Sequence, residues 1–174
     1  MRTAFFLALF ATATMASAQD TRQVFLQDGT GAKLPIATVF LSKDGTYQFE
    51  LVAEAFTDHF LSMRPFRCIE GPTRHLCHVP YPYDIARDIS DDLVDLEYDL
   101  LFVWKGATEY GINMWNGLYW TLEEDGDQWV GTLHEMDMDH LSAPPPAGDM
   151  RPIQDVDLEP ADPDGHWMPF LTVE

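Results

Sequence analysis

Short stretches of alternating apolar and polar residues fill positions 23–132, and most have the length of a β-strand. Residues 34–42 and 46–52 flank Lys43-Asp44-Gly45, a turn sequence that predicts a hairpin. In the second stretch every other side chain is aromatic or aliphatic, so one face of the strand should meet water. Residues 59–68 and 75–81 form a second expected pair, joined by the turn at 70–73.

One segment, residues 90–106, has helical spacing. Ser90 suits an N-cap, and the aspartates that follow it suit the positive end of a helix dipole. Gly106 would end the helix. The apolar positions at helical spacing are Leu93, Leu96, Leu100, Leu101 and Trp104. A buried strand over residues 100–104 is the alternative interpretation.

A three-stranded meander is predicted over residues 110–133. Its strands are 110–115, 118–123 and 128–133, and its turns are Asn116-Gly117 and Asp125-Gly126. If both loops have two residues, Trp120 faces Gly131, which leaves room for the indole. Asn113 then lies beside the same pair.

That register places Trp115, Trp120 and Trp129 on one face of the meander, with Asn113 among them. Aromatic concavities in small β-proteins often bind apolar or amphipathic ligands. Plain core packing is the competing explanation, since tryptophan buries a large area wherever it lies. The four residues are nevertheless the candidate ligand-binding set.

The composition changes after residue 141, where prolines become frequent and favour extended, non-helical chain. We therefore expect a β-rich globular domain over residues 19–141 and a proline-rich acidic tail over 142–174 that packs on it. The fold class is mainly β, with an α+β description at the margin. The expected architecture is a small antiparallel barrel or a sandwich with one amphipathic helix.

The first 18 residues predict a cleaved signal peptide. A basic start precedes an apolar run of about a dozen residues, which ends in a small-x-small cleavage site. The run is shorter than a bilayer requires. The mature protein is therefore expected in a periplasm or outside the cell, without membrane insertion after cleavage.

Acidic residues outnumber basic ones 29 to 10, for a net charge of −19. Nucleic acids and anionic membranes are polyanions and select basic faces, so nucleic acid is not an expected partner. A small apolar ligand or a partner protein remains. Arg64, Arg67 and Arg74 form one basic group, for which internal carboxylates are favoured over an anionic ligand.

Cys68 and Cys77 are the two cysteines of the chain. In an exported protein such a pair predicts a disulfide, here across the turn at 70–73. The eight residues between the two cysteines do not match a CxxC redox motif.

The run from His134 to His140 is the candidate metal site. On a continued strand, His134, Met136, Met138 and His140 share one face. Thioether and imidazole donors suit copper, especially Cu(I). Ordinary packing of an amphipathic edge strand explains the same alternation.

No nucleophile elbow, phosphate-binding loop or dinucleotide fingerprint is present in the sequence. We therefore expect an exported, non-catalytic binding or interaction domain that acts through the aromatic face. A copper-type metal-binding protein is the alternative, and a hydrolase of unrecognised type is the second alternative. No resident cofactor is expected, with copper the one candidate.

Overall fold

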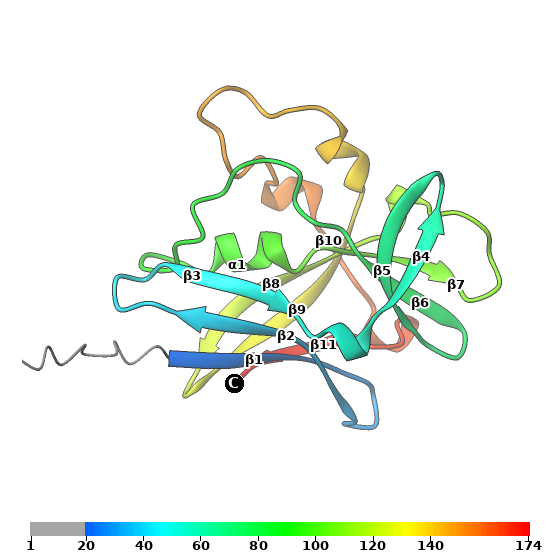
Figure 1. The fold of residues 1–174 in the computed structure, drawn as a ribbon, viewed down its shortest axis with the longest axis horizontal. Helices are drawn as coiled ribbons and strands as arrows, with labels where there is room; N and C mark the ends of the chain where they lie inside the picture. Colours follow the sequence, from blue (N-terminus) through cyan, green and yellow to red (C-terminus); the bar gives the residue numbers. More distant parts are fainter. Residues whose placement is uncertain (1–19) are drawn as a thin grey trace, which may run out of the picture.

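The computed structural model describes residues 20–174, so the predicted signal peptide, residues 1–18, lies outside the described residues. The fold is mainly β, as the sequence predicts: within residues 20–174, antiparallel strands join in one eleven-stranded sheet with a single short α-helix (Figure 1). The strands before the helix are β1 (Asp20–Gln27), β2 (Lys33–Leu41), β3 (Tyr47–Leu51), β4 (Thr57–Leu61), β5 (Arg64–Glu70) and β6 (Arg74–His78). The helix α1 (Val94–Asp99) is followed by β7 (Phe102–Gly106), β8 (Gly117–Asp125), β9 (Gln128–Met136), β10 (Glu159–Pro160) and β11 (Phe170–Val173).

The sheet does not close into a barrel. Its strands run in the order β3-β2-β1-β11-β9-β8-β7-β6-β5-β4, with β10 paired to β9, and no ladder within residues 20–174 joins β3 to β4. One buried core nevertheless contains Tyr47 of β3 and Ile69 of β5, from opposite ends of this order. The sheet is therefore curled around a common core while its two edges stay unpaired.

Two predicted hairpins are confirmed. β2 and β3 pair from Leu41↔Tyr47 to Ala37↔Leu51, and β5 pairs with β6 through the turn after Glu70. The segment predicted as one arm from residue 59 is itself a hairpin, because the chain reverses between β4 and β5 at Ser62 and Met63, both with positive φ. Neither residue type favours that conformation, so the sequence carries no clear turn signal there.

The predicted helix over 90–106 is wrong in its second half. Helix α1 ends at Asp99, and residues 102–106 form β7, which pairs with β6 and β8. Phe102, Val103 and Trp104 have high strand propensity, and ladders on both sides of β7 supply the partners for their backbone groups. Leu93 rather than Ser90 is the N-cap residue. No helix among the described residues is long and apolar enough to cross a membrane.

The first strand of the predicted meander is absent. Residues 110–113 are not in a strand, and a 3₁₀ turn (Met114–Asn116) leads directly into β8. The second hairpin is present, but its two-residue loop is Gly126-Asp127, so the register is shifted by two residues. Trp120 therefore lies opposite Leu133, and Gly131 lies opposite Leu122.

The end of the chain lies inside the sheet. Strand β11 pairs with β1 on one side and β9 on the other, and its Leu171 and Val173 are buried (Figure 1). Helix α1 packs on β8, where Tyr98 and Tyr119 join a second buried core. Arg151, from the proline-rich segment, donates to Asp92 and Asp95 beside this helix.

Candidate metal centre

Strand register places three side chains that could bind a metal on one face of the sheet. Glu70 lies opposite His75 across the β5–β6 ladder, and His59 of β4 lies opposite Phe66 of β5. Side chains alternate between faces along a strand, so Phe66 and Glu70 share a face, and their cross-strand neighbours share it too. His59, Glu70 and His75 are therefore brought together by pairing of three consecutive strands.

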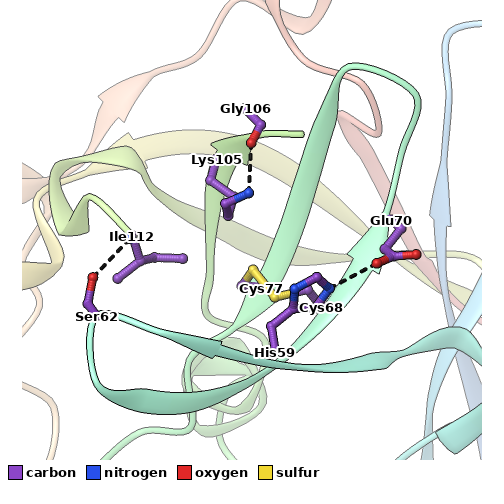
Figure 2. The surroundings of a disulfide bond; sticks show 8 residues. All are labelled: His59, Ser62, Cys68, Glu70, Cys77, Lys105, Gly106 and Ile112. Atoms are coloured by element: carbon purple, nitrogen blue, oxygen red, sulfur yellow. Dashed lines mark hydrogen bonds and ion pairs between the residues drawn. A yellow bond between two sulfur atoms is a disulfide. The ribbon is translucent and has the colours of Figure 1, made fainter. Parts of the chain in front are cut away.

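The distances within this group suit a single ion. His59 Nε2 lies 3.0 Å from Glu70 Oε1, and the two imidazole rings are 5.5 Å apart between centroids. One donor atom from each of the three residues lies within 4.8 Å of the others. No second group of this kind, built from His, Cys, Asp and Glu, occurs in residues 20–174. Figure 2 shows the contact between His59 and Glu70 beside the disulfide.

His75 carries an unusual ring nitrogen. Its Nδ1 is buried and has no hydrogen-bond partner. Burial lowers the pKa of His75, and the positive charge of Lys105 on β7 lowers it further, while Glu70 acts in the opposite direction. The ring is therefore neutral at neutral pH, which is the state that binds metals.

Lys105 is the opposing charge at this site. Its side chain is buried, and its ammonium donates to the Gly106 carbonyl at 2.7 Å (Figure 2). A cation here weakens the binding of a second cation, and the Glu70 carboxylate offsets that repulsion. Two imidazoles and one carboxylate form a donor set used by zinc in proteins, with a fourth position left for water or another ligand.

The predicted disulfide between Cys68 and Cys77 is confirmed. The two residues are directly opposite in the β5–β6 ladder, with Cα atoms 3.9 Å apart. Both residues are fully buried. The next pair along the same face of the ladder is Glu70 and His75. The disulfide therefore fixes the register that brings these two candidate ligands opposite each other.

The predicted aromatic set is divided between the core and the surface. Trp120 and Trp129 are buried in the first core, and the Trp120 indole donates to the Pro169 carbonyl. Trp115 is 69% exposed on the 3₁₀ turn before β8, and Asn113 caps that turn. The structure does not place Trp115 on the sheet face of the other two.

The predicted copper set is divided in a similar way. Met136 and Met138 are buried in the second core. His134 Nδ1 lies 3.0 Å from the Thr132 carbonyl, and His140 lies 3.6 Å from an Asp157 carboxylate oxygen. The strand ends at Met136, so the period-two alternation does not continue to residue 140.

Comparison of the chain with protein-family models, curated proteins and solved structures finds no match. The site is therefore interpreted from its own geometry. The sequence predicted the β5–β6 hairpin but not the register of this site, because a turn at 70–73 would set Glu70 against Thr73 rather than His75. His59 was missed because the reversal at Ser62 and Met63 has no glycine or proline to mark it.

Proposed function

We propose that the protein is an exported metal-binding protein that holds a divalent transition-metal ion through His59, Glu70 and His75. The observation that carries this proposal is the convergence of three donors on one face of β4, β5 and β6. The predicted export signal is consistent with a protein that meets metal ions outside the cytoplasm.

The donor set favours Zn²⁺ or Cu²⁺ over Cu(I). Imidazole and carboxylate are borderline and hard ligands, whereas Cu(I) selects thiolates and thioethers. The cysteines are bonded to each other, and both methionines of the predicted copper set are packed in the second core. Between the two divalent ions, Cu²⁺ should bind more tightly, and Zn²⁺ is the practical probe because it is redox-inert.

A bound metal would also satisfy the buried ring of His75, whose Nδ1 has no hydrogen-bond partner. An unpartnered buried polar atom costs about 1–3 kcal/mol. In a metal site one imidazole nitrogen usually binds the metal and the other donates its N–H to a second-shell acceptor. The same imidazole makes binding pH-dependent. Because ligation requires a neutral ring, affinity should fall as acidification protonates His75.

The test is a Zn²⁺ titration of metal-free protein by calorimetry, with a zinc chelator as competitor. We expect one ion per chain and a loss of about tenfold or more in affinity for His59→Gln and for His75→Gln. The matched controls are His134→Gln and His140→Gln, which change the same residue type outside the proposed site. Both controls should bind zinc as the wild type does.

Two results would overturn the proposal. One is zinc affinity that does not change in His75→Gln. The other is affinity lost in His134→Gln or His140→Gln, which would return the site to the run predicted from the sequence. A Cu(I) competition with Met136→Leu/Met138→Leu separates that alternative, because leucine keeps the volume and removes the thioethers.

A further inference from the structure

A second site lies at the same end of the sheet, where the sheet fails to close, and His59 of the metal centre forms part of its wall. A groove of about 690 Å³ extends from Leu51 of β3 to Phe60 of β4. Pro65 and Pro80 add apolar walls. Phe60 is 69% exposed, so a large aromatic side chain lies at the surface of the groove with solvent as its neighbour. The unpaired sheet edges at β3 and β4 (Figure 1) therefore bound a mainly apolar hollow.

Arg67 lines this groove without a carboxylate partner. Within residues 20–174 no acidic oxygen lies within ion-pair distance of its guanidinium, whose carbon lies 5.5 Å from the centre of the Phe56 ring. Arg87 and Arg151, in contrast, each bind a buried aspartate. Arg22, Arg64 and Arg74 also form no ion pair within residues 20–174, so what distinguishes Arg67 is its place in the wall of the groove.

The other polar residues of the groove are Asp58, His59 and His78. His59 Nε2 lies 3.0 Å from Glu70 Oε1, within the proposed metal centre. Asp58 lies opposite Arg67 in the β4–β5 ladder, but the two side chains form no ion pair. His78 Nε2 is 2.9 Å from the Asp99 carbonyl. Burial lowers the pKa of His78, so this ring adds no positive charge at neutral pH. Arg67 is therefore the cationic group of the groove.

We infer that this groove binds a small amphipathic molecule with a single carboxylate. The apolar part lies against Phe60, Leu51 and the prolines, and the guanidinium of Arg67 binds the carboxylate. Small-molecule pockets have volumes of about 300–1,000 Å³, with mostly apolar walls and a few polar groups that fix orientation. The planar guanidinium fork matches a carboxylate through two parallel hydrogen bonds.

The test uses dodecanoate as the probe, below its micelle concentration and with a chelator present so that metal binding does not contribute. We expect one dodecanoate per chain by calorimetry and a loss of about tenfold or more in affinity for Arg67→Gln. Arg64→Gln is the matched control, because Arg64 is on the same strand, unpaired and on the other face. It should bind dodecanoate as the wild type does. Dodecyltrimethylammonium, with the same chain and the opposite charge, should bind at least tenfold more weakly than dodecanoate.

A second variant keeps the inference testable if Arg67→Gln does not fold. Phe60→Glu changes an exposed side chain and places a negative charge in the groove, so it should weaken dodecanoate binding while the fold survives. His75→Gln should leave dodecanoate affinity unchanged, which separates this site from the metal centre. The inference is overturned if dodecanoate does not bind, if Arg64→Gln and Arg67→Gln weaken it equally, or if the ammonium probe binds as tightly.

Discussion

The region around α1 and the end of the sheet formed by β4, β5 and β6 differ in whether their buried polar groups have hydrogen-bond partners. Around α1, the buried carboxylates of Asp95, Glu97 and Asp99 all accept hydrogen bonds from partners within the chain. At the β4–β5–β6 end, the Nδ1 atom of His75 is buried with no partner. It is the one such side-chain atom in residues 20–174.

The partners around α1 show what a structural polar cluster requires. Arg87 binds both oxygens of Asp99 at 2.7 and 2.8 Å, and Tyr47 donates to the same carboxylate. Glu97 has no cation and accepts from the Tyr119 hydroxyl and the Leu122 amide. Burial accordingly raises the pKa of Glu97, and its two donors offset part of that rise. Every carboxylate of the helix is thus used internally, and none is left to bind a ligand.

The β4–β5–β6 end has the opposite character. His59, Glu70 and His75 lie close together, and Arg67 is unpaired on the other face of the same strands. Large side chains such as Phe60 and Met63 are exposed at its tip. Binding sites keep unsatisfied groups at a cost in stability, so this end is where function is expected. The comparison predicts that mutations at the α1 region destabilise and that some mutations in the site stabilise.

The largest effect is expected for Arg87→Met. This change leaves the Asp99 carboxylate buried with Tyr47 as its remaining side-chain donor, and removal of one partner from a buried ion pair costs about 3–5 kcal/mol. Because the Arg87 side chain is half exposed, the lower end, about 3 kcal/mol, is expected. Urea denaturation measures it. Arg64→Met is the matched control and should cost less than about 0.5 kcal/mol; equal losses would remove the distinction between the two regions.

Removal of the disulfide tests the β4–β5–β6 end of the sheet. Cys68→Ala/Cys77→Ala should cost about 2.5–3 kcal/mol, because the bond closes a short loop and restricts the unfolded chain. The same variant should also bind zinc more weakly, since the bonded pair neighbours Glu70 and His75 in the ladder. Chelator competition at a temperature where the variant is folded measures the second effect. Full zinc affinity in the variant would show that the ladder alone holds the ligands in place.

Gly131→Val should destabilise the tightly packed central strands by about 1–3 kcal/mol, as overpacking does. A Cβ atom at Gly131 would lie 3.0 Å from Leu171 Cβ and 3.1 Å from Trp120 Cδ1. Gly126→Ala is less informative because Gly126 has a positive φ, so Thr132→Val, on the neighbouring exposed position, is the better control. If both valine variants unfold at the same urea concentration, the prediction that Gly131 has no room for a larger side chain is wrong.

The Gly131 contact also shows what could be predicted from the sequence. Placing the turn one residue too early shifted the β8–β9 register by two residues, which left every side chain on its predicted face. The crowding between Gly131 and Trp120 was therefore predicted from an incorrect pairing. Local turn sequences likewise predicted which strands pair in the hairpins of residues 33–51 and 64–78.

Long-range pairing is the part that the sequence did not reveal. β11 enters the sheet between β1 and β9. β7 forms between β6 and β8, where a buried strand over residues 100–104 was the alternative to the predicted helix. Trp115 does not lie on the predicted face, because its segment forms a 3₁₀ turn rather than a paired strand. The candidate metal site depends on one such pairing, that of β4 with β5, and this is why His59 was missed.

The smallest expected effect is an increase in stability, and it tests the comparison of the two regions most directly. His75→Leu removes the buried, unpartnered Nδ1 and keeps an apolar side chain of similar reach. An unsatisfied buried polar atom costs about 1–3 kcal/mol, and the poorer fit of a branched side chain in place of a flat ring offsets part of the gain from removing it. In metal-free buffer the variant should therefore be more stable than the wild type by about 0.5–1 kcal/mol in urea denaturation.

Zinc should reverse that order. At a free concentration of about 100 times its Kd, a ligand that binds only the folded state adds about 2.7 kcal/mol. The wild type gains this increment and His75→Leu does not, so the wild type becomes the more stable protein. His134→Leu is the control, since its ring has a carbonyl neighbour at Thr132, and it should lose stability or stay neutral in both buffers. A His75→Leu variant that is less stable than wild type without metal, and by the same amount with it, would place His75 among the structural residues and assign it no ligand.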